Sequence, residues 1–197
     1  MELVAGNVID PRAGPGEDGF VAELRTAHTA DLDPGTLRAA RALLDEVFND
    51  ELTEADWEHA LGGVHALVWD GPVLIGHGSV IQRRLLYRGR ALRAGYVEAV
   101  AVRAGRRGQG HGAALMGALE RVLRGAYDLG ALGSTDEGAG FYAGRGWKLW
   151  QGPSSVLTPD GIRPTTEDDG CLYVFPLAVP LDLSGELTCD WRDGDVW

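Results

Sequence analysis

A stretch rich in glycine and arginine, Arg103 to Gly112, carries residue types that can bind a phosphate-bearing ligand. Gly108, Gly110 and Gly112 stand where a helix is expected to begin, so the backbone can approach a ligand closely and present unpaired N–H groups. The helix dipole attracts an anion to the same place, and Arg106 and Arg107 add full positive charge. The stretch therefore predicts a diphosphate site.

A glycine-rich loop alone is a weak indication, because glycine is common in this chain, with 29 of 197 residues. The lysine of a P-loop is missing, and the glycine spacing is not that of the dinucleotide-binding fingerprint. The meaning of the stretch comes from its position between a predicted strand and a predicted helix.

The charges fall into two regions of opposite sign. The chain has 29 acidic and 18 basic residues and a formal net charge of -11, which argues against nucleic acid as a partner and favours a cationic one. Acidic residues concentrate in 45–58, 167–169 and 182–195, whereas 83–107 is basic. We therefore expect two ligands of opposite charge.

The two cysteines, Cys171 and Cys189, lack metal-ligand spacing, so we expect free thiols and no metal site. No apolar run has membrane-spanning length, so no membrane partner is expected. The first residues show no signal-peptide pattern. These features predict a cytoplasmic protein.

The elements that must position these residues begin after a leader, residues 1–19, which has no periodicity and is set apart from one domain over 20–197. A strand is predicted over 20–27, and a helix N-capped by Asp33 follows, with Pro34 in its first turn. Its apolar face is predicted to carry Leu37, Arg41, Leu44, Val47 and Phe48. A second helix begins after Thr53, carries Trp57 and Leu61, and ends at Gly62-Gly63.

The remaining pattern alternates strands and helices. Strands are predicted over 64–70, 73–86, 92–102, 129–134, 146–150 and 171–177, and helices over 110–125 and 137–145. A polar loop is expected after Gly152-Pro153, and an acidic tail ends the chain. This order predicts an α+β fold with a mixed central sheet flanked by helices.

The run Arg107-Gly-Gln-Gly110-His-Gly112 resembles the R/Q-x-x-G-x-G/A signature of the GNAT acetyltransferase superfamily, and it lies after a strand and before a helix as that signature requires. The resemblance implies the GNAT acyl-CoA N-acyltransferase fold and acetyl-coenzyme A as co-substrate. The pyrophosphate would then be held by Arg107, Gly108, Gln109, Gly110, His111 and Gly112. The pantetheine arm and thioester would bond the backbone of Val100, Ala101 and Val102, where the strand splays from its neighbour.

Other residues of the chain resemble the aminoglycoside 2′-N-acetyltransferases more narrowly. The resemblance is carried by the runs 56–67, 96–102 and 189–197, and the last of these, Cys-Asp-Trp-Arg-Asp-Gly-Asp-Val-Trp, is the most specific. It implies Glu98 as the catalytic base, the terminal carboxylate of Trp197 as a second candidate, and Tyr142 as the proton donor near the sulfur. Alternatively, Glu98 only helps to hold the cationic acceptor by its charge, and Tyr142 is only an aromatic residue of the core.

An acetyl acceptor must attack as a neutral amine, although an alkyl ammonium has a pKa near ~10, so a base is needed. The resemblance implies acceptor contacts from Glu51, Asp56, Glu98, Ala99, Gly133, Glu167, Asp168, Asp195 and Trp197. Two of these depart from the family pattern: Glu51 stands where relatives tend to carry Asp, and Gly133 where they tend to carry serine.

Three functions remain open from the sequence. The leading one is acetylation of the 2′-amine of an aminoglycoside. The second is acetylation of another amine, such as a polyamine, an endogenous amino sugar or a protein lysine. The third is an acyl-CoA sensor without chemistry, which Glu98 and Tyr142 speak against. A homodimer is expected from apolar segments after Trp150.

Overall fold

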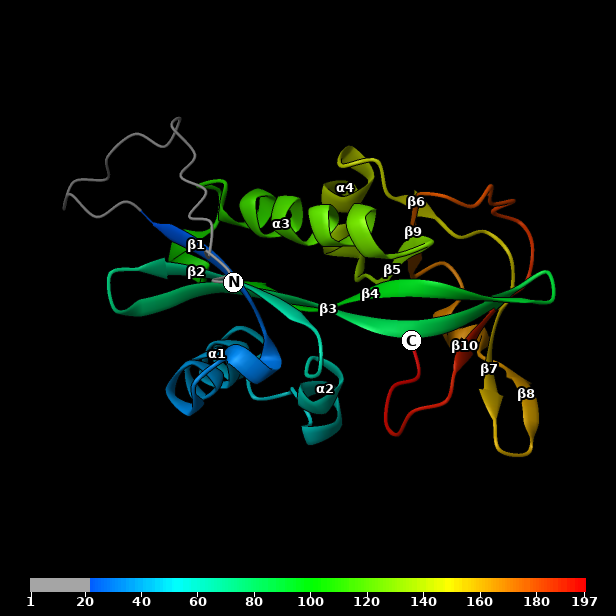
Figure 1. Ribbon diagram of the computed structural model, residues 1–197, viewed down its shortest axis with the longest axis horizontal. Coiled ribbons are helices and arrows are strands. Elements are labelled where there is room, and N and C mark those ends of the chain that lie inside the picture. The colour runs from blue at the N-terminus through cyan, green and yellow to red at the C-terminus, as the bar shows by residue number, and fades with distance from the viewer. Residues whose placement is uncertain (1–21) are drawn as a thin grey trace, which may run out of the picture.

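The computed structural model describes residues 22–197, and these form a ten-stranded mixed sheet with helices on both of its faces (Figure 1). The strand order is β6-β9-β5-β4-β3-β10-β7-β8, and β2 with β1 branches from β3. The predicted leader, 1–19, and the first two residues of the predicted first strand lie outside the described residues. The α+β class with a mixed sheet is confirmed.

The first helices lie on one face of the sheet (Figure 1). After β1 (Glu23–His28), α1 (Pro34–Val47) begins at Asp33, whose carboxylate accepts from the amides of Gly35 and Thr36 at 2.7 and 3.0 Å. This confirms the predicted cap, but the buried face of α1 differs from the predicted apolar face. The buried residues are Ala40, Leu43 and Leu44, whereas Phe48 follows the last turn and is 36% exposed.

The second helix, α2 (Glu54–His59), begins with the predicted capping arrangement, in which Thr53 and Asp56 exchange hydrogen bonds. It ends earlier than predicted. Ala60 caps it, so Leu61 lies beyond the helix. The helix therefore has fewer than two turns, and it places Asp56 and His59 beside the sheet.

Three long strands form the centre of the sheet. β2 (Val64–Asp70), β3 (Val73–Tyr87) and β4 (Arg90–Val102) pair antiparallel, as the hairpin prediction requires. The helix α3 (His111–Ala126) packs across the other face of these strands (Figure 1). It lies so close that a Cβ at Gly95 would be 2.3 Å from a methyl group of Leu123. Glycine is therefore required at position 95 for α3 to pack this closely against β4.

The strand β5 (Leu129–Gly133) lies parallel to β4, and α4 (Asp136–Gly144) follows it on the α3 face. The strand predicted over 146–150 is reduced to β6 (Lys148–Leu149), while β9 (Leu172–Pro176) matches its prediction closely. None of the helices in the described part of the chain has the length and apolar character to cross a membrane.

The predicted polar loop after Gly152-Pro153 and the predicted acidic tail were wrong. The loop region contains β7 (Ser154–Thr158) and β8 (Gly161–Pro164), and the tail contains β10 (Leu187–Asp190), which inserts between β3 and β7. The hydroxyl groups of β7 made it look like a loop, yet they are buried and paired: Ser155 Oγ lies 2.8 Å from Thr188 Oγ1. Buried polar side chains are stable in a sheet once each has a partner.

Candidate active site

The glycine-rich loop leads directly into α3 and has the geometry of an anion site. Gly108 and Gly110 have φ of 76° and 86°, a conformation that side chains disfavour, and Gly110 is the N-cap of α3. The first α3 bond from Ala114 N–H reaches Gly110 O at 3.0 Å, and none of the described side chains caps the helix. The preceding amides therefore face outward and are free to bind an anion.

The two arginines of this loop differ in their availability. Arg106 is paired with Asp70, so its charge is largely neutralised within the protein. Arg107 donates from Nε to the Val102 carbonyl at 3.1 Å and is exposed. Arg106 thus ties the loop to the end of β2, whereas Arg107 remains available, and the contribution of both charges to anion binding stays a prediction.

The strands β4 and β5 separate next to this loop. They pair only at Ala94–Tyr96 on β4, so the following six residues of β4 diverge from β5. The register of β4 with β3 also shifts, since Glu98 pairs with Ser79 and Ala101 with His77. Ala99 lies at this bulge with φ of 51°. The predicted splay is therefore present over 97–102 and includes Val100–Val102.

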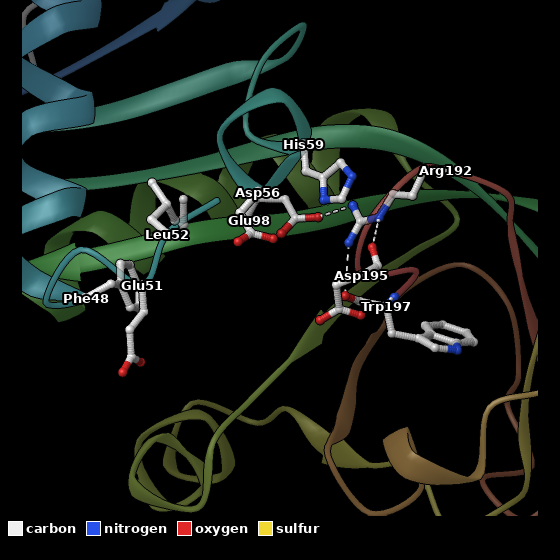
Figure 2. Close-up of a pocket in the computed structure, with 10 residues that line it drawn as sticks. Phe48, Glu51, Leu52, Asp56, His59, Glu98, Arg192, Asp195 and Trp197 are labelled. Carbon is white, nitrogen blue, oxygen red and sulfur yellow. Dashed lines mark hydrogen bonds and ion pairs between the residues drawn. The ribbon is translucent and has the colours of Figure 1, made fainter. Parts of the chain in front are cut away.

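A cavity of about 270 Å³ opens beside the bulge, on the side of α1 and α2 (Figure 2). Six of the predicted acceptor residues line it: Glu51, Asp56, Glu98, Ala99, Asp195 and Trp197. Its other lining residues are Phe48, Leu52, His59 and Arg192. The cavity therefore joins α2, β4 and the C-terminus, which lie far apart in the sequence.

The carboxylates of this cavity differ in how they are held. Asp56 accepts from the Thr53 amide at 2.9 Å and its hydroxyl at 2.8 Å through the same oxygen, which leaves its other oxygen free. Glu51 follows α1 and is exposed, and Figure 2 shows its side chain pointing away from Asp56 and Glu98. The extra methylene of Glu51 therefore extends it toward solvent.

Arg192 is the cavity residue that sequence reasoning missed. Its Nη1 donates to Glu98 Oε1 at 2.5 Å, its Nη2 to the terminal Trp197 O at 2.9 Å, and its Nε to Asp195 O at 2.7 Å. One guanidinium thus joins both candidate bases (Figure 2). The run Cys189–Trp197 indicated that the tail belongs to the site. Arg192 itself was not predicted, because an arginine is not expected among acidic residues that bind a cationic ligand.

Burial raises the pKa of Glu98, and the Arg192 guanidinium opposes that rise. Burial also lowers the pKa of His59, helped by the charge of Arg192, while its Nε2 lies 2.8 Å from Asp193 O. A carboxylate that is desolvated yet paired can take up a proton more readily than a surface carboxylate. This is the property that a general base needs.

A second cavity of about 310 Å³ shares Asp195 with the first and lies against β7, β8 and the tail. It brings together Glu167 and Asp168, along with Arg163 and Trp191. Burial, together with the charges of Asp195, Glu167 and Asp169, raises the pKa of Asp168 to about 6. The acidic lining therefore continues from one cavity to the next.

Two of the predicted catalytic and acceptor residues, Tyr142 and Gly133, line neither of these cavities. Tyr142 lies on α4 in an aromatic cluster, with its ring centroid 6.1 Å from Trp147 and 6.4 Å from Tyr173, and burial raises its pKa. Gly133 ends β5, where an added Cβ would lie 3.7 Å from the Tyr96 hydroxyl. The core-aromatic interpretation of Tyr142 thus describes its packing, and its role in proton transfer stays a prediction.

The comparisons with known proteins agree with this geometry. A model of the acetyltransferase (GNAT) domain matches residues 29–150. YhbS of Escherichia coli, a GNAT family N-acetyltransferase solved in complex with CoA, superimposes with a TM-score of 0.60 at 16% identity, covering 89% of this chain and 93% of that one. An acyl-CoA N-acyltransferase from Pseudomonas aeruginosa gives 0.57 at 17% identity, with 79% and 99% covered. The fold is that of the GNAT acyltransferases, which use acyl-CoA.

A curated relative defines the family more closely. The aminoglycoside 2′-N-acetyltransferase of Mycolicibacterium fortuitum is 53% identical over 189 residues, which cover 94% of this chain and 97% of that protein. This chain belongs to the aminoglycoside 2′-N-acetyltransferase family within the GNAT acetyltransferases.

Proposed function

We propose that this protein transfers the acetyl group of acetyl-coenzyme A to the 2′-amino group of an aminoglycoside. The observation that carries the proposal is the cavity in which Glu98 and the terminal oxygen of Trp197 share Arg192 beside the β4 bulge. The relative from Mycolicibacterium fortuitum is named for this reaction. The acidic lining suits an acceptor that carries several ammonium groups.

The donor would bind across the opening between β4 and β5. Its pyrophosphate would lie on the amides of the loop from Arg107 to Gly112, where the helix dipole and the Arg107 guanidinium stabilise negative charge. The backbone of Val100–Val102, unpaired on the β5 side, would bond the pantetheine arm and the thioester. The acyl carbonyl would then point past the bulge toward Glu98.

The acceptor would span the two cavities. One amino-sugar ring would place its amine near Glu98 while Asp56 and Asp195 bind neighbouring ammonium groups, and the rest of the molecule would extend over Glu167 and Asp168. A single ion pair in water is worth only about 1 kcal/mol at ~4 Å, so several partly desolvated carboxylates are needed. The shared residue Asp195 joins the two cavities for such a ligand.

Acetyl transfer would proceed by attack of the neutral amine on the thioester carbonyl. Glu98 would accept the ammonium proton, directly or through water, before or during the attack. The nitrogen would lose its second proton as the amide forms and the coenzyme A thiolate leaves. Tyr142, whose hydroxyl burial keeps protonated, is the proposed donor of a proton to that thiolate, and it would regain a proton from the amide nitrogen through solvent. The Trp197 carboxylate is the alternative base.

Release of the coenzyme A thiol with a matched pair of acceptors tests the proposal. One aminoglycoside carries a 2′-amine and the other a 2′-hydroxyl, with the remaining amines unchanged. We expect turnover with the first only. Equal turnover of both would exclude the 2′ position, and coenzyme binding without turnover of either would indicate a sensor.

We also propose that the chain forms a homodimer. Three large apolar side chains after Trp150 are exposed: Leu157 at 41%, Ile162 at 54% and Trp191 at 50%. Apolar side chains gathered on a surface favour association. Sedimentation of the protein at several concentrations checks this, and a single species with the mass of one 21.0 kDa chain would contradict it.

A further inference from the structure

A chain of hydrogen bonds runs through the sheet from the start of the first helical turn to the β4 bulge. The Thr29 hydroxyl lies 2.8 Å from His65 Nε2, His65 Nδ1 lies 2.9 Å from His77 Nε2, and His77 Nδ1 lies 2.9 Å from the Ala99 carbonyl oxygen. Both imidazole rings are fully buried, with 0% of their surface exposed. Such groups are stable only when each is paired.

The chemistry of the groups fixes the direction of this chain. The Ala99 carbonyl only accepts, so His77 Nδ1 carries a proton and a neutral His77 ring must accept at Nε2. His65 Nδ1 must then donate, which leaves His65 Nε2 to accept from the Thr29 hydroxyl, to which it lies closer, at 2.8 Å, than the other acceptor of that hydroxyl, Gly63 O at 3.2 Å. That hydroxyl in turn accepts from the Gly62 amide at 2.9 Å. Each imidazole thus has one assignable tautomer, with the proton on Nδ1.

The chain ends on a strained residue. Ala99 has φ of 51°, which residues other than glycine, asparagine and aspartate rarely adopt. At this bulge, two residues of β4, Ala99 and Val100, lie opposite one residue of β3, Gly78. His77 is the neighbour of that glycine, and its ring binds the carbonyl of the strained residue. A fixed donor therefore holds the bulge in a conformation that its own residue type does not favour.

The bulge lies between the two halves of the proposed site. Glu98 and Ala99 line the acceptor cavity, while Val100–Val102 run along the opening between β4 and β5. A change in the Ala99 peptide plane would turn the Glu98 side and the Val100–Val102 side of the bulge at once. The contacts of Glu98 and the thioester-binding backbone therefore depend on one carbonyl orientation.

We propose that His77, supported by His65, is a positioning residue for catalysis, because its Nδ1–H bond to Ala99 O sets the bulge that aims Glu98 and the Val100–Val102 backbone at a common point. This inference rests on the proposed function for its catalytic consequence. The two histidines are not a proton relay, since the chain ends on a carbonyl that has no proton to exchange.

The ionisation of the two rings agrees with this role. Burial lowers the pKa of His77 to about 4, and burial together with the charge of His77 lowers the pKa of His65 to about 4. Both rings are therefore neutral at pH 7. The hydrogen-bond chain requires this, because each ring in it carries one proton. A second proton on His77 would lie on Nε2 and leave two donors facing each other at the link between the rings, whereas a second proton on His65 would lie on Nε2 and face the Thr29 hydroxyl.

Two His77 variants provide the kinetic test. His77→Asn keeps an amide N–H donor close to the position of Nδ1, whereas His77→Leu keeps the apolar volume and removes the donor. We expect kcat of the Leu variant to fall about 10²-fold, as a small misplacement of reacting groups does, with coenzyme Kd changed less than about threefold. The Asn variant should recover most of that loss. Full kcat in the Leu variant, or equal losses in both variants, would overturn the proposal.

A measurement on the unaltered protein keeps the test independent of activity and of variant folding. Two-bond ¹H–¹⁵N correlation spectra at pH 7 report which nitrogen of each imidazole carries the proton. We expect both His65 and His77 to be Nδ1–H tautomers. An Nε2–H tautomer of His77 would overturn the inference even if the protein acetylates its acceptor. Expected tautomers in a protein that fails to acetylate would reject the proposed function and leave the histidine chain intact.

Discussion

Arg192 holds Glu98 and the C-terminus together: its Nη1 lies 2.5 Å from Glu98 Oε1 and its Nη2 2.9 Å from Trp197 O. A cation in a site for a cationic guest reduces the attraction of that site. The arrangement nevertheless has a use, because the same guanidinium offsets the cost of burying Glu98 and fixes the last residue of the chain. The acceptor amine therefore meets a base that is already oriented.

Glu98→Gln is expected to lower kcat about 10²- to 10³-fold, with a smaller change in acceptor KM. The amide keeps the shape of the side chain and can still accept from Arg192, but it cannot take up a proton. Steady-state kinetics with the 2′-amino acceptor measures both constants. Glu51→Gln is the control, because that carboxylate lines the same cavity and points away. A loss confined to KM would assign Glu98 to acceptor binding.

The role of the terminal carboxylate can be separated from that of the Trp197 indole. Addition of one glycine after Trp197 moves the carboxylate and leaves the indole, whose Nε1 donates to Thr165 Oγ1 at 2.8 Å. We expect this extension to lower kcat at least about tenfold while coenzyme Kd stays nearly constant, because the oxygen held by Arg192 no longer belongs to a free carboxylate.

Thr165→Val is the matched control for that extension. It removes the partner of the indole, and with it a 2.7 Å bond to the Ser154 hydroxyl, and keeps the carboxylate, so the protein should lose stability, by about 2 kcal/mol for two buried hydrogen bonds, rather than activity. Unfolding in urea measures the first quantity and thiol release the second. Full activity of the extended protein would exclude a catalytic or orienting role for the C-terminus.

Local motifs predicted the glycine-rich loop of the candidate site, whereas its acceptor and catalytic residues were implied by the family resemblance. The strand, loop and helix around Gly110 are adjacent in the chain, and their geometry follows from glycine conformations that are readable residue by residue. The bulge at Ala99 was not predictable in this way. Alanine gives no sign of a positive φ, and the donor that holds it, His77, lies on another strand.

The C-terminal strands show a second limit of local reasoning. β7 and β10 are short and carry serine, threonine and aspartate, which are typical of loops, and only their pairing with each other and with β3 makes them strands. Arg192 was missed for a related reason. Its partners Glu98 and Trp197 meet only because β10 returns the tail to the centre of the sheet.

Asp168→Asn should change the dependence of stability on pH. The folded-state pKa of about 6 lies above the usual 3.8, so the folded protein retains a proton that the unfolded chain has lost between these values. Stability from this group is therefore present below about pH 4 and is lost as pH rises through 6. The variant removes that loss, and we expect its free energy of unfolding to exceed that of the parent at pH 8.

The size of this effect is expected to stay below about 1 kcal/mol, because Asp168 is partly exposed and solvent screens its acidic neighbours. Urea unfolding at pH 8 and at pH 4 measures it, and an equal difference at both values would contradict the assignment to titration. At pH 8 the same variant should raise acceptor KM several-fold without a change in coenzyme Kd. An unchanged KM would remove Asp168 from the acceptor site.

The diphosphate site is tested by two glycines of one loop. Gly110 has φ of 86° and caps α3, so Gly110→Ala forces a side chain into a left-handed conformation that costs about 1–2 kcal/mol. Gly112 has no such φ, and a Cβ there would make only ordinary contacts, the nearest at 3.6 Å to Phe141.

We expect Gly110→Ala to raise coenzyme Kd at least about tenfold and Gly112→Ala to leave it within about threefold. Calorimetric titration of coenzyme A measures both, and 3′-dephosphocoenzyme A, which keeps the diphosphate, should show the same ratio between the variants. Equal affinity of the parent and Gly110→Ala would place the diphosphate elsewhere, because a ligand held by these amides cannot be indifferent to the peptide planes that present them.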